Sequence, residues 1–356
     1  MPLSDRENWR RNASLEGHEW IPSGAYVSLA SWREEPEEFE RVCREHPTIF
    51  PDFSGRPAGW DTQHERRRWQ DPWGCQWEAE IDGLEGVVLG SPLADWEDFR
   101  TWTPPEPPEL TDADRRAFRQ QKDAGQVAVG QLDHGLLFLR LQYLRGFDNF
   151  MADIATQDPR LDELIAVVER YNEKRVRGYV DAGIDLLDGG DDLGTQTNSI
   201  LGPKHFRRYL LPTYQRLFAI ARQAGAHVHL HHDGYVMDIA DEIVATGATI
   251  VNPQDLVNGI DAIAANFKGR VCVNLDVDRQ KILPFGSPRD VRELIKEEVM
   301  KLGSPAGGLQ FIAGIYPPTP ARNVEALCEA FEEFRTYWTR RQAANTPHAT
   351  DGRKSP

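Results

Sequence analysis

Short apolar runs alternate with amphipathic stretches along the chain from about residue 126 onward. This alternation is typical of βα units that surround a parallel sheet. With a further strand expected near residues 21–29 and one more concealed in the irregular region that follows, the strand count approaches eight. The pattern therefore predicts an α/β protein, specifically a (β/α)8 TIM barrel with an irregular, Trp-rich N-terminal extension. The apolar runs interpreted as strands are 126–132, 184–187, 227–231, 249–252, 271–275 and 309–313.

Proline marks the starts of three expected helices between these runs. Proline at the first turn of a helix has no amide hydrogen to lose, so it is a start signal. Pro203 is expected to open a helix that ends near Gly225, and Ser287-Pro288 one that ends near Gly303. Thr319-Pro320 is expected to open the last helix.

The tryptophans divide the chain into two parts. Nine of the ten lie between Trp9 and Trp102, in a proline-rich stretch with few helical periods. Such rings more often serve a core, although Trp73 and Trp77 also suit a lid over the barrel mouth. We expect an extension with the first barrel elements over 1–125, the main part of the same barrel over 126–339, and a disordered tail over 340–356.

Composition limits the function classes. A chain of 356 residues with 40% hydrophobic content is long enough for a sizeable core. The formal net charge of −15 argues against nucleic acid or an anionic membrane as the main partner. The four cysteines form no CxxC pair, and the N-terminus has no apolar signal core. We expect a cytoplasmic protein that acts on a small molecule.

Four of the ten histidines lie in residues 227–232, within a stretch that otherwise reads as a strand. Alternate side chains of a strand share a face, so His227, His229 and His231 point one way and His232 the other. Buried imidazoles cost free energy unless each finds a partner. The pattern predicts a polar site at the C-terminal end of this strand, with His227 equally well explained as a satisfied core residue.

The other strands also end in polar residues. In a (β/α)8 barrel the loops after the strands build the active site. The candidate catalytic residues are therefore Asp192, Gln196, Gln254, Asp276 and Tyr316. Each also has a structural interpretation: aspartate caps helices and forms turns, Gln254 and Asn252 can satisfy backbone groups, and Tyr316 can shape the loop beside Pro317-Pro318. No glycine-rich phosphate loop of the GxGxxG or GxxxxGK[ST] type occurs.

Several short motifs carry a resemblance to a known family. Taken together, they make the chain similar to the uroporphyrinogen decarboxylase superfamily, which groups heme-pathway decarboxylases with corrinoid-linked methyltransferases on a (β/α)8 barrel. The motifs are DPWG at 71–74, SPL at 91–93, DDLGTQ at 191–196, GPKHF at 202–206, HHDG at 231–234, NPQ at 252–254, GG at 307–308 and TPARN at 319–323.

The sequence differs from the pattern of both branches of the superfamily. The decarboxylases share an N-terminal arginine segment that grips substrate carboxylates, and residues 1–60 contain no match to it. The zinc-dependent methyltransferases use a His-x-Cys pair and a later cysteine. Here His231 matches the histidine, Asp233 replaces the first cysteine, and the later position falls near Ala313-Gly314.

The resemblance implies a methyltransferase that moves a methyl group from a small O- or N-methyl substrate to a corrinoid protein. Zinc would be held by His231, Asp233 and His229, with Asp192 or Asp276 as other choices for the third ligand, since imidazole and carboxylate suit this metal. Decarboxylation of uroporphyrinogen or a related carboxylated substrate is the alternative, although the acidic strand ends would repel a polyanion. A catalytically inactive binding protein is the third interpretation.

Overall fold

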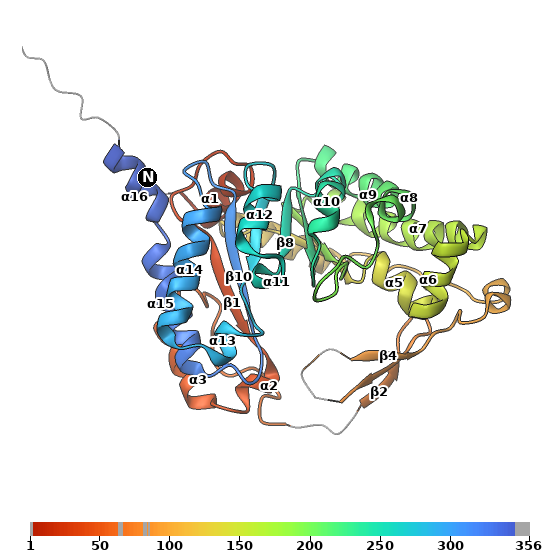
Figure 1. Ribbon diagram of the computed structural model, residues 1–356, viewed down its shortest axis with the longest axis horizontal. Helices are drawn as coiled ribbons and strands as arrows, with labels where there is room; N and C mark the ends of the chain where they lie inside the picture. The colour runs from red at the N-terminus through yellow and green to blue at the C-terminus, as the bar shows by residue number, and fades with distance from the viewer. Residues whose placement is uncertain (1–2, 63–66, 81–83, 85, 346–356) are drawn as a thin grey trace, which may run out of the picture.

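The computed structural model describes residues 3–62, 67–80, 84 and 86–345, and its centre is a sheet of seven parallel strands (Figure 1). The strand order across the sheet is β1-β10-β9-β8-β7-β6-β5. All seven agree in place with the runs predicted from the sequence, and the α/β barrel class is confirmed. The strands are β1 (Ser23–Val27), β5 (Val129–His134), β6 (Leu186–Gly190), β7 (His227–His232), β8 (Ile250–Pro253), β9 (Cys272–Asp276) and β10 (Leu309–Ile315).

The expected eighth strand does not join this sheet within the described residues. β1 and β5 are the two edges of the sheet, and residues 49–57 lie beside β1 around a cavity of about 450 Å³. Pro51 and Pro57 in this segment have no amide hydrogen to give to a strand ladder. The region that follows instead forms a separate antiparallel sheet of β2 (Arg67–Gln70), β3 (Gln76–Ala79) and β4 (Val87–Gly90).

One helix precedes the first strand, and the other helices lie between or after the strands of the sheet. The predicted helix from Pro203 is broken into two, because Pro212 lies in the first turn of the second and cannot donate to the preceding turn. The other two predicted helices are confirmed as α14 and α15. The helices are α1 (Asp5–Ala13), α2 (Leu29–Trp32), α3 (Pro36–Glu45), α4 (Asp112–Asp123), α5 (Phe138–Arg145), α6 (Phe147–Thr156), α7 (Pro159–Asp181), α8 (Pro203–Tyr209), α9 (Leu211–Gln223), α10 (Ala240–Ala245), α11 (Asp255–Asn258), α12 (Ile260–Phe267), α13 (Ile282–Phe285), α14 (Pro288–Leu302) and α15 (Ala321–Phe334).

The end of the chain corrects one prediction. α16 (Tyr337–Asn345) continues into the segment expected to be a disordered tail, so residues 340–345 are helical. The Trp338 indole donates to Val299 O of α14 at 2.9 Å and fastens the start of this helix. Residues 346–356 lie outside the described part of the chain.

Tryptophans of the N-terminal region serve mainly as core. Trp73 is 3% exposed and stacks on Trp102, and Trp77 packs edge-on against Tyr143 of α5. A lid role for Trp73 and Trp77 stays a prediction. All four cysteines are buried and free. None of the helices in the described residues is long and apolar enough to cross a membrane.

The alternation of β7 appears as the sequence predicts. Val228, Leu230 and His232 are fully buried behind the strand, and the other three histidines occupy the opposite face. Because all seven strands are parallel, their C-terminal ends meet at one edge of the sheet. The side chains that follow β5, β6, β7 and β9 are therefore brought together.

Candidate functional site

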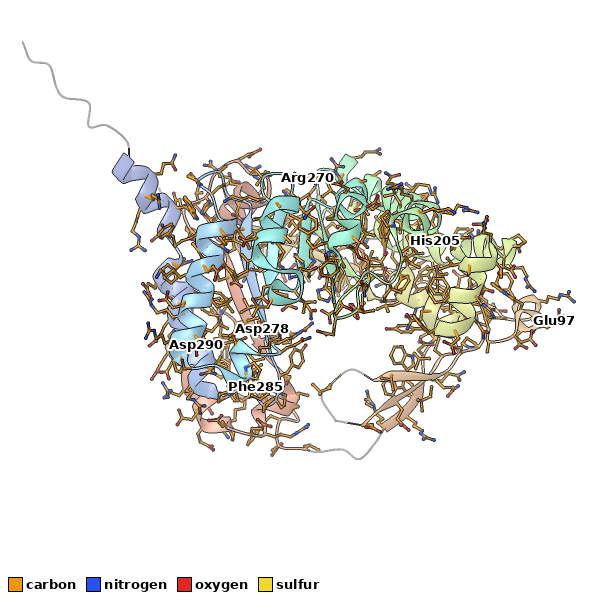
Figure 2. The ribbon with its side chains drawn as sticks, in the orientation of Figure 1. Glu97, His205, Arg270, Asp278, Phe285 and Asp290 are labelled. Carbon is orange, nitrogen blue, oxygen red and sulfur yellow. The ribbon has the colours of Figure 1, made fainter. Side chains whose placement is uncertain are left out.

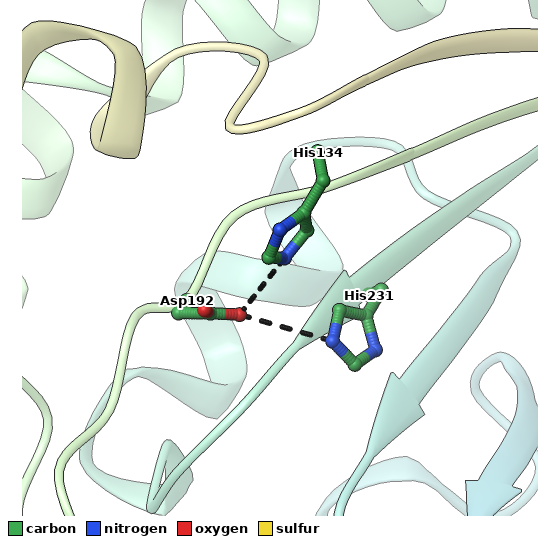
Figure 3. A group of neighbouring side chains, drawn as sticks. All are labelled: His134, Asp192 and His231. Carbon is green, nitrogen blue, oxygen red and sulfur yellow. Dashed lines mark hydrogen bonds and ion pairs between the residues drawn. The ribbon is translucent and has the colours of Figure 1, made fainter. Parts of the chain in front are cut away.

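His134, Asp192 and His231 form a compact group at this edge (Figure 3). His134 ends β5, Asp192 follows β6, and His231 lies near the end of β7. The Asp192 Oδ1 atom lies 3.1 Å from His134 Nε2 and 3.8 Å from His231 Nε2. One donor atom from each side chain lies within 4.8 Å of the other two. Two imidazoles and a carboxylate at this spacing are a suitable ligand set for zinc.

Asn252 fixes the orientation of His231. The His231 Nδ1 atom lies 2.6 Å from Asn252 Oδ1, and the amide nitrogen of Asn252 donates to Asn274 O. The Asn252 oxygen is therefore an acceptor, and His231 Nδ1 carries the hydrogen. In a neutral ring this leaves a lone pair on Nε2, which faces Asp192 and Asp233. An outer hydrogen bond of this kind is typical of metal-binding histidines.

An ion-paired group borders the three ligand candidates. Asp233 lies 3.3 Å from His231 Nε2 and accepts a hydrogen bond from Arg279, whose guanidinium also lies 3.3 Å from Asp276 Oδ2. Burial opposes the charge of His231, but the hydrogen bond and charge of Asp233 outweigh it and raise the pKa of His231. For Asp276, burial has the opposite effect on the pKa: it raises the pKa to about 6, although Arg279 acts to lower it. Asp233, Asp276 and Arg279 therefore form a charged cluster beside His231, and the roles expected of the two aspartates stay predictions.

Tyr316 joins the same network from the end of β10. Its ring lies 5.5 Å from the Arg279 guanidinium, and its hydroxyl forms a hydrogen bond with Tyr26 of β1. Tyr26 is not among the predicted residues. Tyr316 thus contacts Arg279 of this group, and its catalytic role stays a prediction.

Two other predicted residues have clear structural partners. Both ring nitrogens of His229 are occupied, Nδ1 by Asp188 at 2.5 Å and Nε2 by Asn274 at 3.0 Å. His229 does not belong to the group of potential metal ligands, because it lies two residues before His231 and is bonded within the sheet. Gln254 accepts a hydrogen bond from Gly234 N at 2.9 Å and so holds the turn after β7.

Gln196 and Asp191 lie apart from the ligand candidates. The Gln196 side chain is exposed in the turn that Thr195 and Asn198 close. Asp191 is fully buried and accepts hydrogen bonds from Leu137 N and Leu139 N at 2.9 Å, so it caps α5. Burial raises the pKa of Asp191 to about 6 despite these bonds. Of the paired acids after β6, only Asp192 faces the two histidines.

Besides Tyr26, sequence reasoning missed His134 and Arg279. The predicted apolar run ends at residue 132, whereas β5 continues to His134. The polar end of that strand, Asp133-His134-Gly135, gives the same signal as the other strand ends. Arg279 follows Asp276 in the loop after β9, and only the neighbouring acids make it a candidate.

Known proteins resemble this chain in sequence and in fold. The family model for uroporphyrinogen decarboxylase (URO-D) matches residues 78–334. A uroporphyrinogen decarboxylase of Thermus thermophilus is 28% identical over 182 residues, which are 49% of this chain and 47% of that protein, so the chain spans about half of its length. The structure of a methyltransferase from Methanosarcina mazei has the same fold, with a TM-score of 0.60 and 16% identity over 93% of this chain and 99% of that chain. Because the family model covers more than half of the sequence, the protein belongs to the uroporphyrinogen decarboxylase family.

Proposed function

We propose that this protein is a methyltransferase that takes a methyl group from a small O- or N-methyl substrate and passes it to a corrinoid on a partner protein. Zinc would be held by His134, Asp192 and His231, and the protein would act in the cytoplasm. The observation that carries the proposal is the grouping of His134, Asp192 and His231, whose donor atoms all lie within 4.8 Å of one another, with the His231 ring oriented by Asn252. The donor set differs from the one expected from sequence: His134 and Asp192 take the places of His229 and Asp233, and Asp233 lies beside them as the partner of Arg279.

The chemistry of methyl transfer explains why such a site is needed. When the methyl group leaves an ether or amine, the oxygen or nitrogen keeps the bonding electron pair and gains negative charge. A bound metal would act as a Lewis acid that stabilises this charge. His134, Asp192 and His231 would hold it in place, and Asn252 would orient the His231 ring.

The leaving atom also needs a proton, and Asp276 is the candidate donor from this chain. With its pKa raised to about 6 by burial, Asp276 is mostly ionised at pH 7 but takes up and releases a proton more readily there than an exposed aspartate does. Arg279 and Tyr316 would position the substrate beside it, and Gln254 would keep the turn after β7 in shape. Gln196, in its exposed turn, would contact substrate only at the outer rim of the site.

Decarboxylation of a carboxylated substrate is the second candidate, favoured by the match to the Thermus thermophilus decarboxylase. Such an enzyme needs cations to hold carboxylates and an acid to protonate the carbanion. Arg279 would be the main fixed cation, but Asp233 and Asp276 already engage it. The acids around the histidines therefore favour the methyltransferase.

The proposed function is tested by supplying cob(I)alamin and a panel of methylated ethers and amines to zinc-loaded protein. Formation of methylcobalamin that disappears in His231→Ala supports the proposal. Conversion of uroporphyrinogen without methyl transfer would replace it with the decarboxylase. If neither reaction is observed with substrate panels of both kinds, the result would favour a binding protein that has lost catalysis.

A further inference from the structure

A pair of buried acids lies behind the loop that carries Arg279. Glu298 of α14 is 0% exposed and Asp255 of α11 is 1% exposed. Neither carboxyl oxygen of Glu298 has a hydrogen-bond partner in the structure of the described residues, although the side chain lies within reach of Asp255. The charged groups with the largest influence on Glu298 are Asp255, Glu297 on its own helix and Asp278, all of them acids.

Asp255 fastens the loop after β9. Its Oδ1 accepts a hydrogen bond from Leu256 N at 2.5 Å, and its Oδ2 accepts one from Asp278 N at 2.9 Å. Asp278, beside α13 in Figure 2, in turn accepts hydrogen bonds from Gln280 N at 3.2 Å and Lys281 N at 2.9 Å. Arg279 lies within this bonded turn.

α11, which begins at Asp255, also holds the loop after β7. Asn258 donates to Gly234 O at 3.0 Å and accepts a hydrogen bond from Val236 N at 2.9 Å. α11 therefore bonds to both loops of the Asp233–Arg279 ion pair.

We propose that Glu298 is a positioning residue whose protonated carboxyl group donates to Asp255, and that loss of this proton releases the turn that holds Arg279 in the site. Two adjacent carboxylates without a cation cannot both be charged in a buried site at low cost. Burial accordingly raises the pKa of both Glu298 and Asp255. The inference depends on the proposed function only in that Arg279 belongs to the site.

The linkage has a definite sign. In the folded protein the pKa of Glu298 is raised, so the closed turn is fully favoured below the usual pKa of glutamate and loses stability as the pH rises toward the folded pKa. Opening of the turn, which lets Glu298 ionise, should therefore become more frequent as the pH rises. A glutamine at the same position cannot ionise and should remove this pH dependence.

The test measures the reactivity of Arg279 with phenylglyoxal, which attacks free guanidinium groups, by mass spectrometry of the intact folded protein. Exposed Arg100 supplies an internal reference, because its side chain is 77% exposed against 19% for Arg279. In the wild type, the Arg279 to Arg100 ratio should rise with pH by up to about tenfold per unit. In Glu298→Gln the ratio should stay low across the same range.

Glu293→Gln is the matched control, since it removes the same charge from an exposed position of α14, where the side chain is 48% exposed. It should keep the wild-type pH profile. Thermal melts confirm that each variant is folded. A Glu298→Gln profile that matches the wild type at every pH would overturn the inference. Since no substrate or metal takes part, failure of the proposed methyl transfer leaves this result unaffected.

Discussion

His227 and His231 lie on the same face of β7, yet they have opposite environments. They are four positions apart in sequence, which corresponds to about 13 Å along the strand. At the N-terminal end, His227 is bonded to Thr249 at 3.1 Å and Ser14 at 3.3 Å and packs edge-on against Trp9. At the C-terminal end, His231 meets Asn252, Asp233 and Asp192.

The difference shows that the position of these two histidines along the parallel strand determines their hydrogen-bond partners and the direction of their pKa shifts. Burial lowers the pKa of His227, whose neutral ring is held by hydroxyl groups. Acidic neighbours raise the pKa of His231. The two ends of one strand thus provide a structural histidine and a candidate ligand, each with its own measurable consequences.

The largest expected effect separates the two rings directly. His231→Ala should lower kcat/KM by at least about 100-fold, because losing groups that only orient a metal ligand already costs about 10- to 100-fold. His227→Ala should keep near-normal activity and lose about 1–3 kcal/mol of stability, since Ser14 and Thr249 lose a partner. Steady-state kinetics and urea unfolding measure both quantities. Equal loss of activity in the two variants would contradict the interpretation of His231 as a ligand candidate and His227 as a structural residue.

The residues that hold the two rings give the next largest effect. Asn252→Ala removes the acceptor of His231 Nδ1 and should lower zinc affinity and activity by about 10- to 100-fold. Thr249→Val removes the hydroxyl beside His227 Nδ1 and should lower the free energy of unfolding by about 1 kcal/mol, with activity unchanged. Zinc competition with a chelator and urea unfolding provide the comparison. If Asn252→Ala binds zinc like the wild type, Asn252 does not orient a ligand.

The pH dependence of stability should have opposite signs at the two ends. The raised pKa of His231 means that its contribution is present below the unfolded value of 6.5 and is lost as the pH rises through its folded pKa. The lowered pKa of His227 means that its contribution is present above 6.5 and is lost as the pH falls through its folded pKa.

Urea unfolding of chelator-treated protein between pH 5.5 and 8 tests this sign. The advantage of the wild type over His231→Gln should shrink as the pH rises, whereas its advantage over His227→Gln should grow. Parallel curves for the two variants would show that their surroundings do not differ as the hydrogen bonds indicate.

The smallest expected effect concerns Gln196, in the exposed turn after β6. Gln196→Ala should change stability by less than about 0.5 kcal/mol, as is usual for surface positions. Activity should stay within about twofold of the wild type, measured in the same assay as His231→Ala. A loss of activity as large as that of His231→Ala would show that Gln196 takes part in catalysis and does not lie only at the outer rim of the site.

Much of the fold follows from the sequence pattern. Strand runs such as 271–275 and 309–313 are short and mainly apolar, so composition and length identify them. The eighth strand could not be placed, because residues 49–57 contain proline and glycine that interrupt any strand pattern. The break at Leu210 was missed because two helices in succession show the same apolar period as one.

The candidate site was only partly predictable, for a different reason. Asp192, Asp233 and His231 come from consecutive strand ends and could be grouped by the barrel rule. Which imidazole joins His231 depends on which strands are neighbours in space, and β5 brings His134 to Asp192 from 58 residues away. His229 satisfies the same sequence rule, but Asp188 and Asn274 occupy both its nitrogens, a fact that only three-dimensional packing reveals.

Zinc titration by calorimetry, on chelator-treated protein, shows whether His134, Asp192 and His231 form a metal site. We expect a single zinc ion to bind per chain, with binding lost in His134→Ala, Asp192→Ala and His231→Ala and retained in His227→Ala. Unchanged zinc binding in His134→Ala and Asp192→Ala, or equal loss in His227→Ala, would contradict it.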